Sequence, residues 1–270
     1  MKIKLWSIIF LTVLTAIIVF SWNTNAAEKK PPFHPGERLV FQVKWTFIPA
    51  GKAVLEIFPI ETIDGVKSYH FVMSVKTSEF VDLFYKVRDR IESYTDAGMT
   101  HSILYKKRCK GKANKDVVVK FDWEKQEARY SDFGEKRDPI SIFPGSFDPL
   151  SVFYAFRWHD LKENLEIQTA VTDGNTSIIG KAKVIKRERI TVPTGDYDTF
   201  LVEPDLKHIG GVFKQSKNAK LQIWVTSNYR HIPVKIKSKV KVGSFVAELV
   251  SLRINEPNSI PPVLPSGRDR

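Results

Sequence analysis

The sequence predicts a largely antiparallel, all-β protein with one short helix. Apolar and polar residues alternate with period 2 through most of the chain, as in 39–46, where nearly every second residue is apolar. Turn residues separate the runs, as Asp64-Gly65 does between 52–58 and 69–76. Strands and helices do not alternate along the chain as they would around a parallel sheet.

The composition indicates a folded body with a large core. The 270 residues carry 42 Lys and Arg against 30 Asp and Glu, a formal net charge of +12. The chain is 43% apolar and contains 18 Phe and 6 Trp, which suits a globular protein. Its single Cys excludes an intramolecular disulfide framework and Cys-rich zinc or iron–sulfur sites. No long apolar run follows Trp22, which excludes a polytopic membrane protein.

The first residues predict an export segment. Lys2 and Lys4 precede the uncharged, mostly apolar run Leu5–Trp22, and small side chains end at Ala26. We therefore predict a signal peptide over residues 1–26 that is cut after Ala26. The alternative is an uncleaved N-terminal anchor, because the run is barely long enough to span a bilayer. No cysteine closely follows the run, which excludes lipoprotein processing.

The rest of the chain divides into a lead-in, one domain and a tail. Residues 27–35 are rich in Pro and Lys and predict a disordered lead-in. A single all-β domain is expected over 36–254. Its strands are predicted at 39–46, 52–58, 69–76, 84–94, 103–107, 117–123, 127–130, 165–171, 176–186, 189–192, 198–202, 221–225, 232–242 and 245–252. Four prolines in 255–270 predict an extended, disordered tail.

The helix is predicted over 148–158. Asp148 is a strong N-cap residue, and Pro149 suits the first helical position. Leu150, Phe153, Tyr154 and Trp158 fall on one stripe, and Val152 and Phe156 widen the apolar surface. A helix this apolar must lie against a sheet or in its mouth.

Several motifs together resemble a family of bacterial exported proteins filed as a domain of unknown function, over roughly residues 33–252. They are Gly36–Phe41 with Trp45 and Ala50-Gly51, Arg88–Tyr94, Asp148–Ser151 with Tyr154 and Arg157, Val192–Tyr197, Ile223–Thr226, and Ile232–Lys235. The resemblance implies a periplasmic setting and a curved sheet, and it supplies no catalytic residues. A looser architectural likeness is to periplasmic lipoprotein carriers. The expected fold is therefore a strongly curved antiparallel sheet or open half-barrel, with the helix packed on or in its concave face.

Motifs for catalysis or metal binding are missing from the sequence. None of the six histidines has a partner at a known metal-ligand spacing, so we predict no metal site. Nucleophile elbows and phosphate-binding loops are also missing, so we predict no catalytic residue and no cofactor. Cys109 lies among Lys106–Lys110, and cations can activate a thiol. We favour a strand-end cysteine without a chemical role, because no second catalytic partner is evident.

One buried ion pair is predicted. In the strand that contains Arg88–Glu92, Asp89 shares a face with Ile91. A carboxylate on an apolar face needs a buried partner, and we expect Arg157 to supply it. This pair would be a structural brace inside the sheet rather than an acid–base dyad, because a carboxylate beside an arginine stays ionised.

Lysines alternate with other residues along 235–241, and further cations gather in 181–189 and 106–115. Such lysines either protect sheet edges or attract anionic lipid, lipopolysaccharide or acidic polysaccharide. Nucleic acid is not expected, because the aromatic residues do not interleave with the basic ones. The aromatic residues either fill a closed core or line a cavity for an acyl chain, with the helix as plug or lid.

The function predicted first is non-enzymatic periplasmic binding of a hydrophobic or amphiphilic anionic ligand, such as a lipid or lipid-linked envelope component. The expected ligand-binding residues are Trp45, Phe153, Phe156, Lys235 and Lys237. One alternative is an envelope interaction or scaffold module that binds protein or polysaccharide. Another is a hydrolase of an envelope polymer, because carboxylates from separate strands leave no local motif. Peripheral membrane contact is compatible with the charge, and the sequence does not predict an oligomeric state.

Overall fold

A computed structural model gives the structure of the chain over residues 30–111, 114–205, 219–240 and 243–254. The chain divides into two compact units, Met1–Pro31 and Pro32–Arg270, and the fold lies in the second unit. The predicted signal peptide at 1–26 and the predicted tail at 255–270 lie outside the described residues.

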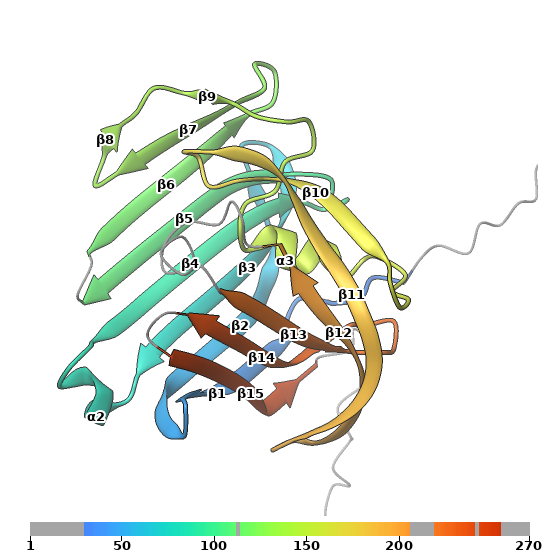
Figure 1. Ribbon diagram of the computed structural model, residues 1–270. Helices are drawn as coiled ribbons and strands as arrows, with labels where there is room; N and C mark the ends of the chain where they lie inside the picture. The colour runs from blue at the N-terminus through green and yellow to red at the C-terminus, as the bar shows by residue number, and fades with distance from the viewer. Residues whose placement is uncertain (1–29, 112–113, 206–218, 241–242, 255–270) are drawn as a thin grey trace, which may run out of the picture. The chain divides into compact units, whose positions relative to one another are not determined.

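Within the described residues, 15 strands form one antiparallel sheet, which confirms the predicted fold class (Figure 1). Neighbouring strands follow the order β10-β11-β12-β13-β14-β15-β1-β2-β3-β4-β5-β6-β7-β8, and β9 pairs with β7. The strands are β1 (Arg38–Trp45), β2 (Ile48–Ile63), β3 (Val66–Thr77), β4 (Val87–Asp96), β5 (Ser102–Gly111), β6 (Lys115–Asp122), β7 (Glu127–Asp132), β8 (Glu135–Lys136), β9 (Ile140–Ser141), β10 (Glu166–Thr172), β11 (Ser177–Val192), β12 (Gly195–Pro204), β13 (Lys220–Thr226), β14 (Pro233–Val240) and β15 (Gly243–Arg253).

The first and last strands of the domain meet in the middle of the sheet, where β1 pairs with β15. The strands β1–β8 and β10–β15 therefore form two wings, which bend around α3 (Ser151–Phe156) (Figure 1). Among the described residues no ladder joins β10 to β8, so the sheet is an open half-barrel. The connection before α3 crosses the gap through an isolated bridge between Phe147 and Val171. The predicted half-barrel with a helix in its concavity is thus confirmed.

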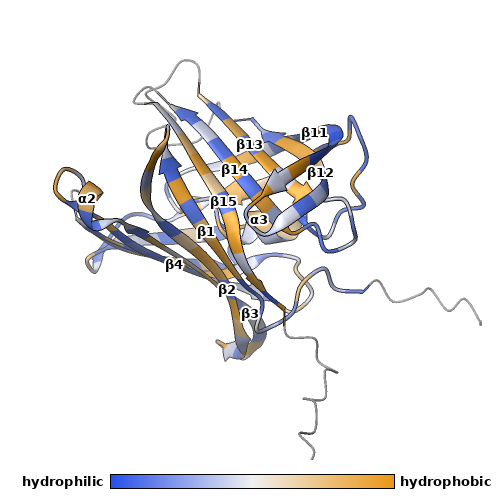
Figure 2. Cartoon of the chain, turned by 90° about the horizontal axis from the view of Figure 1, so that it is seen from below, coloured by the Kyte–Doolittle hydropathy of each residue, from blue (hydrophilic) through white to orange (hydrophobic). Residues whose placement is uncertain are grey.

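The core lies between this concave face and α3. Alternation turns Leu39, Phe41 and Phe71 inward, and all three are buried (Figure 2 shows the same alternation in hydropathy along the strands). Tyr154 of α3 stacks on Phe71, with ring centroids 3.9 Å apart. Phe33 meets both rings edge-on at 5.5 Å. Such aromatic pairs add about 0.5–1.5 kcal/mol each to the stability gained from burial.

Phe33 corrects the predicted lead-in. Residues 27–35 were expected to be disordered, but Phe33 is completely buried. Its ring also packs edge-on against Tyr69 and Trp158. The Pro-rich composition predicted disorder, but one aromatic side chain in this segment fills the space between β3 and α3. The ordered domain therefore begins before residue 36.

The two helices also differ from the sequence prediction. α3 is shorter than 148–158 at both ends, and after Phe156 i→i+3 bonds such as Arg157 N–H to Tyr154 C=O (3.0 Å) replace regular helix. A second helix, α2 (Glu79–Asp82), stands in the connection from β3 to β4. The strand predicted over 84–94 therefore begins only at Val87.

Candidate functional site

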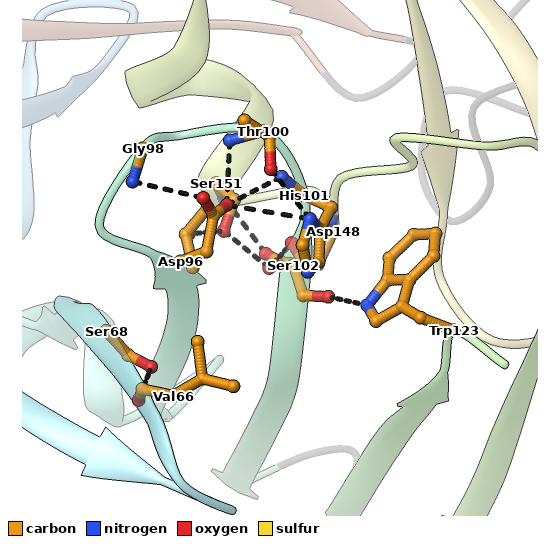
Figure 3. A network of polar contacts seen from close by, with 11 residues as sticks. Val66, Ser68, Asp96, Gly98, Thr100, His101, Ser102, Trp123, Asp148 and Ser151 are labelled. Atoms are coloured by element: carbon orange, nitrogen blue, oxygen red, sulfur yellow. Dashed lines mark hydrogen bonds and ion pairs between the residues drawn. The ribbon is translucent and has the colours of Figure 1, made fainter.

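A buried polar network fixes the start of α3 on the sheet (Figure 3). Asp148 is completely buried, and its Oδ1 accepts the backbone N–H of Ser151 at 3.0 Å, as expected of a residue that caps a helix. Three hydroxyls donate to its Oδ2: those of Ser93 on β4 (2.5 Å), Ser102 on β5 (2.6 Å) and Ser151 (2.6 Å). The network therefore joins α3 to two strands of the first wing.

A buried ion pair fixes the other end of α3. The Nη1 and Nη2 groups of Arg157 donate to both carboxylate oxygens of Glu37 at 2.6 and 2.9 Å, and both side chains are 1% exposed. The same guanidinium donates to the backbone carbonyls of Pro32 (3.1 Å) and Arg230 (2.9 Å). Arg157 thus ties α3 to the segment before β1 and to the turn before β14.

The structure contradicts the predicted brace between Asp89 and Arg157. The segment before β1 brings Glu37 to Arg157 instead, whereas Asp89 lies on β4 opposite Cys109 of β5. Burial raises the pKa of the Cys109 thiol, against the attraction of Lys107, and the Asp89 carboxylate raises this pKa further. A buried thiol with a raised pKa is a poor nucleophile.

The second wing, β10–β15, and α3 line a partly open apolar cavity of about 320 Å³. This volume lies in the range of small-molecule sites. Alternate residues of four strands face it, together with one side of α3. The lining side chains are Ile167, Thr169 and Val171 of β10, Ile178 and Ala182 of β11, Val202 and Pro204 of β12, Leu221, Ile223 and Val225 of β13, and Val152, Phe153 and Phe156 of the helix.

Small residues on β11 keep this cavity open. Gly180 and Ala182 occupy two consecutive inward positions, where the alternation would otherwise place large apolar side chains. A Cβ at Gly180 would lie 3.3 Å from Cγ2 of Val171, so the close approach of β10 also favours glycine at this position. Phe153, Phe156 and Ile223 are left only half-buried by the surrounding protein. These side chains can therefore bury further surface against a ligand.

Four charged side chains border the cavity, two of each sign. Arg157 and Lys181 reach its wall, as do Asp173 and Asp205. Arg157 is bound to Glu37, and Lys181 lies 3.5 Å from Glu166. Because most of the lining is apolar and both cations are already paired, the cavity suits an apolar group.

Two of the five predicted ligand-binding residues, Phe153 and Phe156, line the cavity, and three do not. Ile223, which lines it, pairs with Ile236 on β14, so the adjacent Lys235 and Lys237 point to the opposite face. Lys235 instead lies 2.9 Å from Glu248. Trp45 lies at the end of β1, stacked at 6.5 Å on Phe245. The head-group capture expected from these lysines therefore has no counterpart at this cavity.

The described residues contain no group of three or more His, Cys, Asp or Glu side chains arranged to hold a metal ion. In the same part of the chain, no helix has the length and hydropathy needed to cross a bilayer.

Comparison with known proteins places this fold in a family. The model of DUF3108, described as a protein of unknown function, matches residues 40–250. The chain belongs to the DUF3108 family. No curated protein matches this DUF3108 chain significantly.

A solved structure shares the fold of this DUF3108 chain at low sequence identity, and two others align with it more weakly. A β-barrel-like protein of the DUF1849 family from Brucella abortus aligns with a TM-score of 0.56 at 11% identity, covering 83% of this chain and 99% of that one. A protein from Parabacteroides distasonis, provisionally described as a lipoprotein, aligns with a TM-score of 0.34 at 11% identity, covering 82% and 98%. A protein from Bacteroides fragilis, provisionally described as exported, reaches 0.31 at 9% identity, covering 82% and 97%.

Proposed function

We propose that this DUF3108 chain is a non-enzymatic binding protein, whose cavity between α3 and β10–β13 takes the apolar part of a lipid or other amphiphile. The observation that carries the proposal is the cavity itself, about 320 Å³ of space lined by aliphatic and aromatic side chains. In a scaffold module we would expect this space to be filled by side chains. The proposed setting is the periplasm, and it rests on the sequence of residues 1–26.

The chemistry of the lining supports an acyl chain as the bound group. Each methylene moved from water into an apolar site stabilises a complex by about 0.8 kcal/mol, so about eight methylenes gain roughly 6 kcal/mol. Part of this gain offsets the freedom lost on binding. The hydroxyl of Thr169 and the paired charge of Lys181 lie at the wall, where they can meet a polar end of the ligand.

A pair of neighbouring substitutions on β10 tests the proposal. Thr169 faces the cavity and Gln168 faces the opposite side, where it is exposed. Thr169→Phe fills the cavity, whereas Gln168→Phe adds the same side chain outside it. We expect a fluorescent fatty-acid analogue to bind the wild type and Gln168→Phe equally, and Thr169→Phe at least about tenfold more weakly.

Both variants should keep the circular dichroism spectrum and thermal transition of the wild type. Equal binding by the two variants would place the ligand elsewhere. Failure of the wild type to bind any acyl-chain probe, with no lipid extracted from protein purified from its native cells, would overturn the proposal.

A further inference from the structure

One end of the sheet presents large apolar side chains to solvent. Phe47 in the β1–β2 turn is 90% exposed, and Phe80, Leu83 and Phe84 in the β3–β4 connection are 59, 77 and 76% exposed. We call these four residues the apolar tip. The two segments lie side by side, because Ser78 donates its N–H to Ala50 C=O (2.8 Å) and its hydroxyl to Pro49 C=O (3.1 Å).

The polar groups behind the apolar tip are satisfied within the connection itself. The Arg88 guanidinium binds both carboxylate oxygens of Asp82, and the Thr77 hydroxyl donates to the same carboxylate at 2.5 Å. The Thr77 hydroxyl also accepts the N–H of Val87 at 2.9 Å. These bonds hold α2 in a fixed position that leaves Leu83 and Phe84 pointing away from the core. Figure 2 shows α2 projecting beyond the strands, with hydrophobic residues in and beside it.

A row of cations lies directly behind the apolar tip. Cross-strand pairing places Lys52 opposite Lys76, Lys76 opposite Arg88, and Arg88 opposite Lys110 on β2, β3, β4 and β5. Asp82 neutralises Arg88, and the three lysines are exposed. Like charges directly opposite one another destabilise a sheet, so this row carries a cost in stability.

Edge protection does not explain the row, because β2 to β5 are paired on both sides and are not edge strands. Large apolar side chains in front of lysines are typical of a surface that binds a membrane interface. The apolar side chains pack among the acyl chains, and the lysines contact the anionic head groups. A second copy of the chain suits the tip less well, because it would bring two rows of cations together.

We propose that the apolar tip and the cation row behind it dock this protein on an anionic lipid surface. Phe47, Phe80, Leu83 and Phe84 enter the interface, and Lys52, Lys76 and Lys110 contact the head groups. Trp45, which lies beside this end of the sheet and was expected at the ligand site, is part of the same surface. Docking is separate from binding in the cavity.

Flotation with lipid vesicles tests this docking. The purified protein is mixed with vesicles of phosphatidylcholine alone, or of phosphatidylcholine and phosphatidylglycerol in equal amounts. We expect binding to the anionic vesicles, weaker binding at high salt, and little binding to neutral ones. Leu83→Ser combined with Phe84→Ser should weaken binding by about tenfold or more. Ile60→Ser, an exposed apolar residue toward the other end of β2, should leave it unchanged.

Charge is tested on a single strand. Lys76→Gln removes one member of the row and should weaken binding about fivefold, whereas Lys67→Gln at the opposite end of β3 should not. Thr169→Phe should float like the wild type, which separates docking from the cavity. Absence of wild-type binding to anionic vesicles, or equal binding by the tip and control variants, would overturn the proposal. Dimerisation that depends on Leu83 and Phe84 without vesicle binding would do the same.

Discussion

The buried pair of Arg157 and Glu37 gives a prediction that can be worked through in numbers. Glu37→Gln keeps the shape of the side chain and removes its charge, which leaves the guanidinium without a counter-ion at a site that is 1% exposed. Breaking a buried ion pair in this way costs about 3–5 kcal/mol. Arg157 keeps its bonds to the carbonyls of Pro32 and Arg230, so we expect the lower end, about 3 kcal/mol.

For a domain of this size, 1 kcal/mol shifts the melting temperature by about 2–4 °C, so Glu37→Gln should lower it by roughly 6–12 °C. The measurement is urea unfolding followed by tryptophan fluorescence, with a thermal melt in parallel. Glu56→Gln is the matched control, since it breaks the pair with Arg38, which is 42% exposed. That change should cost at most about 1 kcal/mol.

The double variant Glu37→Leu with Arg157→Met separates the cost of an unpaired charge from the loss of the pair. Replacing both partners by apolar side chains is often neutral or stabilising, so the double variant should be more stable than Glu37→Gln. If Glu37→Gln costs no more than Glu56→Gln, the pair does not hold α3 and this reasoning is wrong.

Three further predictions concern the network, the thiol and pH. Asp148→Asn should destabilise the domain by about 1.5–3 kcal/mol in urea unfolding, because the amide replaces an acceptor of several charge-assisted hydrogen bonds, and an unchanged midpoint would contradict this role. Cys109 should react with a thiol reagent only after unfolding, because burial raises its pKa, and rapid reaction of the native protein would show that the strand end is open. At Glu248, burial favours the neutral acid, but hydrogen bonds from Lys235 and Lys44 outweigh it and lower the pKa below 4.5. A carboxylate with a lowered pKa stabilises the fold at pH values above its ordinary pKa, and this stabilisation is lost as the pH falls. Below pH 4.5, the free energy of unfolding of the wild type should therefore fall more steeply than that of Glu248→Gln. Parallel curves would refute this.

The sequence predicts the sheet and the helix because both depend on local patterns. Period-2 alternation marks most strands, and Asp148-Pro149 marks the start of α3. The same alternation does not show whether facing side chains meet or leave a gap. Phe153 and Phe156 could be predicted at the cavity from the helix alone, whereas its strand walls could not. Gly180 and Ala182, two small residues in inward register, are the signal that could have indicated them.

Partners distant in the chain could not be predicted in the same way. Asp89 was predicted as the partner of Arg157 from its place on an apolar strand face, and only the folded topology brings Glu37 within 2.6 Å of Arg157. The lysines of β14 were assigned to the ligand because strand patterns do not say which face is concave. The exposed residue Phe84 was predicted in a strand, because Phe84 and Tyr85 are adjacent aromatic residues and aromatic residues have high β-propensity.

Photo-crosslinking tests the central claim, that the cavity holds the apolar part of a ligand, most directly. A fatty acid that carries a diazirine on its chain is bound to the protein, and the complex is irradiated. The modified peptides are then identified by mass spectrometry. We predict adducts on α3 and on inward residues of β10–β13, such as Phe153 and Ile223, and their loss in Thr169→Phe but not in Gln168→Phe. Adducts confined to the apolar tip, or unchanged in Thr169→Phe, would contradict it.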